Sequence, residues 1–274
     1  MHLLAWLVIA VLYAPTLAQL YTSGWRMVDY THAYFILPVS LWLVWQDRYC
    51  WGPLLEERRK AAGPLPLAIL ACGLVVFLFG WRFDYLSIAT ASLIPVLYGA
   101  AAALYGPQLA KAFDFPIGYL ALLIPPPAGV LDAITLPMRY GASVVGTWVL
   151  KLLGYPVARQ GLLLAMGTHE IYLGAPCSGF RSLITMLTLG LLYVHLAKSE
   201  RRHRLLLISA IVPLALIGNL IRVLALCLVT YYFGEAAGQG FFHTFSGLLV
   251  FAIMLLGLMN LERLLCNSPT RCGV

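Results

Sequence analysis

Eight long apolar runs, separated by short charged or Gly/Pro-containing loops, constrain the fold of this chain more than any other feature. They cover residues 3–20, 31–46, 64–81, 85–105, 112–127, 177–197, 204–232 and 243–263. A run of roughly 20 apolar residues matches an α-helix that crosses a bilayer, whereas strands of a membrane barrel are about half as long. We therefore expect an all-α integral membrane protein of about eight transmembrane helices, forming one polytopic domain over residues 1–274.

The composition agrees with this expectation. Only 11% of residues are charged and 61% are hydrophobic, and the mean hydropathy is +0.86. A water-soluble domain carries about 25% charged residues. The net charge of +7 comes from basic residues in the short loops, where the positive-inside rule explains them. No nucleic-acid partner is predicted.

The basic loops also predict the orientation of the chain. Of the 18 lysines and arginines, eleven fall in loops assigned to the cytoplasmic side, among them "EERRK" at 56–60 and "KSERRHR" at 198–204. Five fall outside, and Arg181 and Arg222 lie within spans. The N-terminal run has no basic segment before it, so it is expected to be a retained helix rather than a signal peptide. Both termini are expected to be cytoplasmic.

The segment between the fifth and sixth spans differs from the others. "VLDAITLPMRYGASVVGTWVLKLLG" spaces three charges along a moderately apolar sequence, which is typical of an amphipathic helix at the membrane surface. "RQGLLLAMGTHEIYLG" contains two short strand-like runs about "MGTH", which predicts a hairpin that ends at Gly174. Both features are expected on the extracytoplasmic side, just before Cys177.

Three polar residues from different spans are expected at one depth. Cys177 begins the sixth span, and His243 begins the eighth. Arg222 lies 18 residues after the cytoplasmic Arg204, a rise of about 27 Å along a helix, close to the outer edge of a core of about 30 Å. Asn219 lies three residues before Arg222 and shares its helical face.

These residue types suit acyl transfer. A nearby guanidinium favours a cysteine thiolate and can stabilise an oxyanion. A histidine of near-neutral pKa can accept the thiol proton and return it to a leaving amine. The combination of Cys177, Arg222 and His243 therefore predicts a cysteine-dependent site. The six cysteines form no CxxC pair or metal-type cluster with histidine, and no metal or cofactor is predicted.

Simpler interpretations stay open for each residue. A cysteine in a membrane helix usually packs as a small apolar residue, as expected for Cys72 and Cys227. Arg222 can form a structural ion pair or hydrogen bond with another residue of the protein. Together with Asn219 it can instead line the polar pathway of a transporter or an assembly scaffold. Against a transporter, the chain shows no inverted repeat. The remaining open residues are Arg181, which competes with Arg222 or binds a lipid head group, Glu170, which orients a base or belongs to the hairpin, and His32 and His169.

At these residues the sequence resembles the exosortase/archaeosortase family. The resemblance lies in "APCSGFRSL" around Cys177, "GNLIRV" around Arg222 and "FHTFSG" around His243. The motifs occur in the family's order, and residues 110–265 correspond to the catalytic core. The resemblance implies a stand-alone membrane cysteine protease or transpeptidase at the extracytoplasmic face of the cytoplasmic (inner) membrane, with a bacterial source favoured over an archaeal one.

The resemblance also implies partners and roles. The substrates are exported proteins with a C-terminal sorting tail, consisting of a Pro-Glu-Pro-like motif, an apolar helix and a basic end. Cys177 would form a thioester acyl-enzyme, His243 would protonate the leaving amine, and Arg222 would stabilise the oxyanion, with Ser178, Arg181 and Asn219 in support. The final acceptor stays open between an exopolysaccharide or other amine or hydroxyl group and water.

Overall fold

The fold was analysed in a computed structural model that describes residues 2–25, 30, 32–46, 48, 63–167, 169–174, 179–197, 201–234, 237 and 241–266. The described chain is mostly helical, with one small sheet. It divides into two compact units, Met1–Pro127 and Ala128–Val274. Unit 2 contains the segments in which the three motifs lie.

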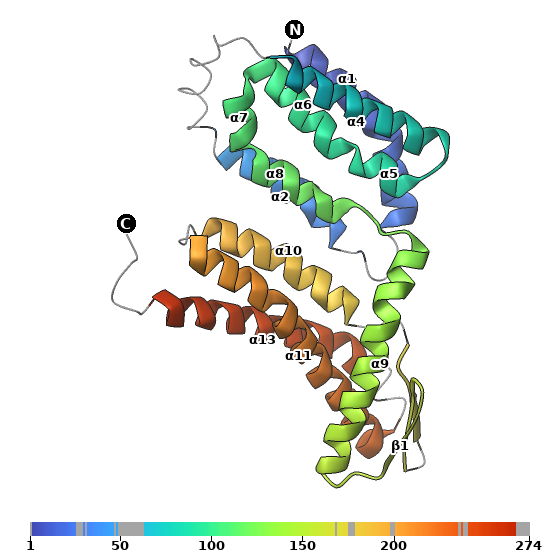
Figure 1. Cartoon of the computed structure of the whole chain (residues 1–274). Helices are drawn as coiled ribbons and strands as arrows, with labels where there is room; N and C mark the ends of the chain where they lie inside the picture. The colour runs from blue at the N-terminus through green and yellow to red at the C-terminus, as the bar shows by residue number, and fades with distance from the viewer. Residues whose placement is uncertain are drawn as a thin grey trace. The chain divides into compact units, whose positions relative to one another are not determined.

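In the residues that the structure describes, unit 1 consists of helices and their connections. Its elements are α1 (His2–Gln19), the π-helix η1 (Leu20–Gly24), α2 (Ala33–Gln46), α4 (Pro64–Arg82), α5 (Leu86–Ala91), α6 (Leu93–Tyr105), α7 (Pro107–Ala112), α8 (Asp114–Tyr119) and the 3-10 helix η5 (Leu120–Leu123) (Figure 1).

Glycines bring α4 close to its neighbours in unit 1. A Cβ atom on Gly73 would lie 2.8 Å from Val96 Cγ2, and one on Gly99 would lie 2.6 Å from the Leu70 backbone nitrogen. Helices in membranes pack through such small residues, because lipid supplies no hydrophobic drive for association. A buried hydrogen bond of 2.7 Å between the hydroxyls of Tyr13 and Ser92 adds a polar link.

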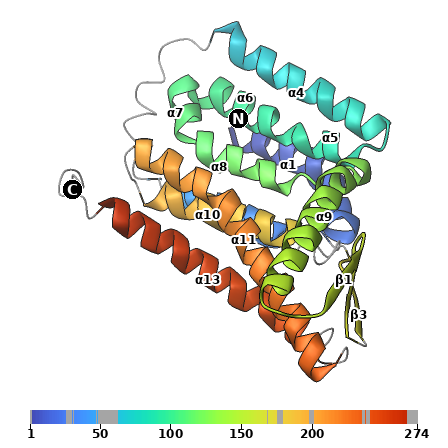
Figure 2. The ribbon, with the colours of Figure 1, turned by 60° about the horizontal axis from the view of Figure 1, so that its bottom comes forward.

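Unit 2 combines a helical bundle with the sheet. Its elements are α9 (Ala128–Leu152), β1 (Val157–Gln160), β2 (Leu163–Met166), β3 (His169–Tyr172), α10 (Phe180–Leu196), α11 (Arg201–Phe233) and α13 (Phe241–Cys266). Helices α10, α11 and α13 pack against one another (Figures 1 and 2).

The core of this bundle is apolar and closely packed. Met186 and Val194 of α10 are buried together with α11 and α13 side chains, namely Leu207, Ile211, Ala215, Val250, Met254 and Leu258. Gly218 of α11 faces Met254 so closely that an added Cβ would lie 2.8 Å from Met254 Cγ. The bundle therefore holds α11 firmly along the part of its length that precedes Asn219.

The three strands form an antiparallel sheet in the order β1-β2-β3. Met166 pairs with His169 across the turn at Gly167, which has a φ of 61°. The hairpin predicted about "MGTH" is thereby confirmed. The prediction missed β1, in which Val157 pairs with Met166 and Gln160 with Leu163. Only Val157 of β1 is buried, so its four residues lack the repeated alternation that marks a strand.

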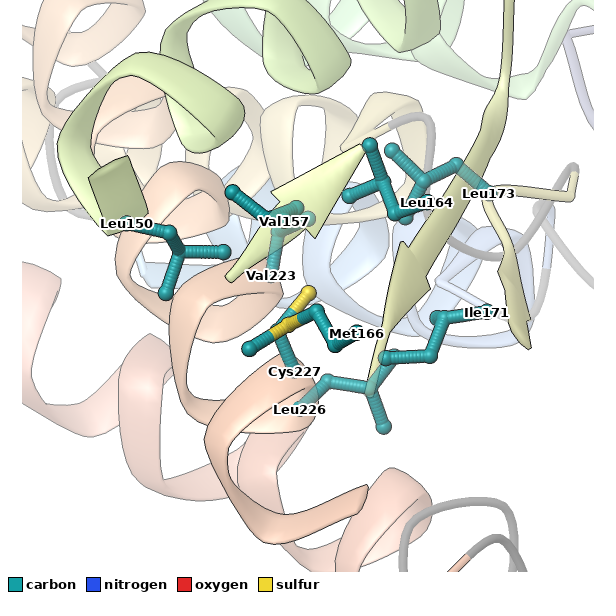
Figure 3. Packing of buried hydrophobic residues seen from close by; sticks show 9 residues of the cluster. All are labelled: Leu150, Val157, Leu164, Met166, Ile171, Leu173, Val223, Leu226 and Cys227. Atoms are coloured by element: carbon teal, nitrogen blue, oxygen red, sulfur yellow. The ribbon is translucent and has the colours of Figure 1, made fainter. Parts of the chain in front are cut away.

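One face of the sheet packs on α11. The cluster in Figure 3 joins Leu150 of α9, strand and strand-end residues, and three α11 residues; its sheet-side members are Val157, Leu164, Met166, Ile171 and Leu173, and its α11 members are Val223, Leu226 and Cys227. This cluster follows Arg222 directly along α11. The sheet is therefore fixed to the part of α11 that carries the arginine.

Helix α9 is present as predicted. Three small polar residues, Thr135, Ser143 and Thr147, are buried together with Leu150, whereas Trp148 and Leu152 are largely exposed. Thr147 donates to the Ser143 carbonyl oxygen at 2.7 Å and Ser143 to that of Tyr140 at 2.8 Å. An exposed apolar face of this kind suits contact with lipid.

The expectation of eight spans is met only in part. Within the part of the chain that the structure describes, four helical stretches are long and apolar enough to cross a membrane: His2–Gly24, Pro64–Arg82, Leu86–Tyr105 and Arg201–Phe233. Three other apolar helices, at Ala33–Gln46, Asp114–Leu123 and Phe180–Leu196, are shorter than the usual spanning length of about 20 residues. The structure supports a helical membrane protein, and eight spans are not confirmed.

Candidate active site

Helix α11 buries the polar pair predicted from the "GNLIRV" motif. Asn219 is 3% exposed and Arg222 is 8% exposed. Arg204 and Arg222 belong to one continuous helix, so the rise of about 27 Å between them holds along a single axis. Burying a guanidinium costs free energy unless charge and hydrogen bonds compensate. The buried guanidinium of Arg222 therefore requires hydrogen-bond acceptors or negative charge around it.

Gly179, which precedes α10, lies against Asn219 of α11. A Cβ atom on Gly179 would lie 2.5 Å from Asn219 Cγ, 2.7 Å from Nδ2 and 2.8 Å from Cβ. No side chain larger than hydrogen fits this space. The φ of Gly179 is 75°, in the left-handed region that glycine adopts without steric cost. The start of α10 thus lies directly on the turn of α11 that precedes Arg222.

The left-handed residue also corrects a predicted boundary. The sixth span was expected to begin at Cys177, but α10 begins at Phe180, with Gly179 as its N-cap. A left-handed residue cannot continue a right-handed helix, so the helix starts after it. Cys177 and Ser178 lie outside the described residues.

His243 belongs to the first turn of α13, which packs against both α10 and α11. Its side chain lies outside the described part of the structure. The backbone of α13 begins at Phe241, two residues before the histidine, so the expectation that His243 opens the eighth helix agrees with the helix bounds.

The other polar residues left open by the sequence lie on α10, on β3 and in unit 1. Arg181 is exposed in the first turn of α10, and its carbonyl oxygen accepts a hydrogen bond from Thr185 at 2.7 Å. Glu170 is exposed on β3, and His169 is half-buried on the same strand. His32 is buried in unit 1, with its ring 5.0 Å from that of Tyr30.

Cys72 and Cys227, the two cysteines expected to serve only as packing residues, differ in their surroundings. Cys227 is fully buried in the cluster between α11 and the sheet, and Cys72 is exposed on α4. Across the described ranges, no group of three His, Cys, Asp or Glu side chains is arranged to hold a metal ion.

Sequence reasoning missed Gly179 as a functional residue. The signal was available in "PCSGF", since a glycine directly before a long apolar helix often marks a backbone position closed to other residues. Its packing partner could not be read from the sequence, because Asn219 lies 40 residues later. Only the antiparallel contact of α10 with α11 brings the two together.

Comparison with protein families agrees with this geometry. The family model described as Transmembrane exosortase (Exosortase_EpsH) matches residues 25–260, most of the 274-residue chain. The match begins well before the predicted catalytic core at residues 110–265 and covers most of both structural units. Searches of curated proteins and of solved structures gave no match. The chain belongs to the transmembrane exosortase family.

Proposed function

We propose that this protein is a membrane-embedded cysteine transpeptidase that cleaves the C-terminal sorting tail of exported proteins at the extracytoplasmic face of the cytoplasmic membrane. The tail consists of a short Pro-Glu-Pro-like motif, an apolar helix and a basic end. The apolar helix crosses the bilayer beside the enzyme and presents the motif at the depth of Cys177.

In this reaction the Cys177 thiolate attacks the carbonyl carbon of the scissile peptide bond. The electron pair of the carbonyl moves to oxygen, and the Arg222 guanidinium stabilises the resulting oxyanion. The C–N bond breaks as protonated His243 donates a proton to the leaving amine, which leaves a thioester on Cys177. An acceptor amine or hydroxyl then attacks the thioester, His243 takes the acceptor's proton, and the thiolate is released.

The contact of Gly179 with Asn219 is the observation that carries this proposal. It fixes a backbone position two residues after Cys177 to the α11 turn that precedes the buried Arg222. One packing contact thus joins the residue before α10 to the α11 turn beside the arginine, and this supports placing the Cys177 thiol near Arg222. A cation near a cysteine lowers the pKa of its thiol and increases the thiolate fraction. Asn219 and Ser178 support this geometry, and Arg181 contributes a second positive charge at the start of α10.

Processing of a tailed reporter protein in membranes tests the proposal. Cys177→Ala, Arg222→Ala and His243→Ala should each abolish release of the mature reporter, because each removes a chemical step. Removal of a single oxyanion-stabilising group alone lowers kcat by roughly 100- to 1000-fold in known enzymes. Immunoblots of membrane fractions check that each variant accumulates.

Cys72→Ala and Cys227→Ala are the matched cysteine controls and should retain processing. Normal processing by the Cys177→Ala variant would end this proposal and favour a scaffold. Mass spectrometry of the new C-terminus identifies the final acceptor. A conjugate with an amine or polysaccharide indicates transpeptidation, whereas a free carboxylate indicates that water resolves the thioester.

A further inference from the structure

Strand β3 lies at an edge of the small sheet. The strand order β1-β2-β3 gives β3 one neighbouring strand among the described residues. Leu173, which follows β3, donates its backbone N–H to the Leu162 carbonyl oxygen at 3.0 Å. In an antiparallel ladder, hydrogen bonds to the same neighbour recur at every second residue. Ile171 and His169 therefore direct their backbone groups towards β2, as Leu173 does.

Glu170 and Tyr172 alternate with these residues, so their backbone groups point away from β2. The Tyr172 carbonyl oxygen accepts a hydrogen bond from the Gly174 N–H at 3.0 Å. Among the described residues, no backbone group bonds to the Glu170 N–H, the Glu170 carbonyl oxygen or the Tyr172 N–H. Unpaired groups along an edge strand form a template on which one more strand can pair.

The opposite edge of the sheet, along β1, lies beside α9. The Ser143 hydroxyl of α9 donates at 3.1 Å to the carbonyl oxygen of Gly161, in the turn that follows β1. The Arg159 guanidinium of β1 lies 5.0 Å from the ring centre of Tyr140 of α9. Within the described ranges, the β3 edge is thus the one left open to an incoming strand.

Strand β3 leads to the candidate active site. Leu173 is buried in the cluster that also contains Val223 of α11 (Figure 3), and Gly179 lies against Asn219 of the same helix. Val223 and Asn219 are four residues apart, about 6 Å along the helix. The segment that contains Cys177 therefore starts and ends beside the α11 turn that carries the buried arginine. An extended peptide along β3 is directed towards this turn.

We propose that an extended segment of the substrate polypeptide pairs with the open edge of β3 as an added strand, through backbone hydrogen bonds to Glu170 and Tyr172. The pairing rests on the proposed function, because the segment belongs to the polypeptide that Cys177 attacks. Tyr172 precedes Cys177 by five residues, at most about 17 Å of extended chain. The paired residues therefore lie within roughly five residues of the cleaved bond.

Strand addition obtains its affinity from the main chain of the peptide, and the side chains add specificity. Glu170 and Tyr172 are accordingly positioning residues that act through their backbone groups and take no part in bond cleavage. The side chain of Glu170 is exposed on the outer face of the sheet, so its carboxylate is dispensable for the pairing.

Crosslinking in the Cys177→Ala background tests the pairing without cleavage. Tyr172→Cys is combined with reporters that carry one cysteine at successive positions around the cleavage site, and the same enzyme without Tyr172→Cys gives the background signal. Side chains of a paired strand alternate between the two faces of a sheet, so disulfide formation should recur at every second position. A signal that recurs every third or fourth position, or that does not vary with position, would overturn the pairing. Disulfides between two Tyr172→Cys enzymes that persist in excess reporter would assign the edge to a second copy and also overturn it.

Glu170→Pro and Glu170→Gln form a matched pair for kinetics. Proline removes the outward N–H but no hydrogen bond to β2, and edge strands tolerate it there. KM should be roughly two- to tenfold higher for Glu170→Pro than for Glu170→Gln, as expected for one backbone hydrogen bond, with kcat little changed. Equal KM values would contradict the pairing. Reporter peptides with single N-methylated amides test the same bonds with the enzyme unchanged, and binding should weaken at every second position.

The crosslinking result is separate from the test of the proposed function. Disulfides at every second position support strand pairing even if wild-type enzyme cleaves no reporter. Loss of this alternation contradicts the pairing even if processing depends on Cys177, Arg222 and His243.

Discussion

Gly179→Ala should both destabilise the protein and impair its reaction. The new methyl group would lie 2.5 Å from Asn219 Cγ and 2.7 Å from Nδ2, well inside van der Waals contact, and Asn219 is buried. Overpacking of this kind costs about 1–3 kcal/mol. The φ of 75° adds about 1–2 kcal/mol for a residue with a Cβ. The expected loss of unfolding free energy is therefore about 2–5 kcal/mol.

Gly154→Ala separates the cost of overpacking from the cost of the left-handed backbone conformation. Gly154 has a φ of 86° but no atom within 4 Å of its hypothetical Cβ, so alanine there should cost only the backbone contribution of about 1–2 kcal/mol. Thermal unfolding of the purified variants in detergent should rank wild type above Gly154→Ala and Gly154→Ala above Gly179→Ala. Reporter processing should fall in Gly179→Ala, since a shift of about 1 Å in reacting groups can cost roughly 100-fold in rate.

A double-mutant cycle with Asn219→Gly tests whether the loss in Gly179→Ala comes from the contact with Asn219. Glycine is needed because the Asn219 Cβ alone would remain 2.8 Å from the new methyl group. Gly179→Ala should cost about 1–3 kcal/mol less in the Asn219→Gly background than in wild type. Additive effects, or a Gly179→Ala variant no less stable than Gly154→Ala, would refute the contact between Gly179 and Asn219 as the source of the loss.

Two further predictions concern the rest of unit 2. Gly218→Ala should separate α11 from α13 and lower the thermal midpoint, because its Cβ would lie 2.8 Å from Met254 Cγ. Met254→Ala is itself destabilising, since Met254 is buried in the core, but Gly218→Ala should cost less in that background than in wild type. Gly257→Ala, with ordinary contact at 3.7 Å, is the control that should not share the loss. The hydrogen bond of 3.0 Å between the Tyr155 and Tyr232 hydroxyls raises the pKa of Tyr155, so this bond should stabilise the fold below about pH 10 and be lost as pH rises through the raised pKa. Tyr232→Phe should lower the pKa of Tyr155 in a tyrosinate absorbance titration, and an unchanged titration would contradict that assignment.

Local patterns were sufficient for the helices and for part of the candidate site. Long apolar runs predict helices because only a helix satisfies every backbone hydrogen bond within one segment in lipid. The spacing of three residues between Asn219 and Arg222 predicts that they share one face of the helix. Both residues are buried. The "MGTH" turn predicted the β2–β3 hairpin, because a turn and its two strands are neighbours in sequence.

Features that depend on distant partners could not be predicted in this way. Strand β1 exists through its pairing with β2 and the burial of Val157, and its own four residues carry little strand pattern. Hydropathy predicted eight spans; the described residues support four by length and composition, and the number eight is not confirmed. The start of α10 was placed at Cys177 because the left-handed backbone of Gly179 has no signature in hydropathy.

The sequence by itself determined that this is a helical membrane protein with Cys177, Arg222 and His243 in motifs that resemble those of exosortases. The tertiary structure alone decided that Gly179 packs on Asn219 and that one face of the small sheet packs on α11. The physical reason is that hydropathy and helical spacing report on a few residues along one chain segment. Close packing arises only when segments far apart in sequence come together.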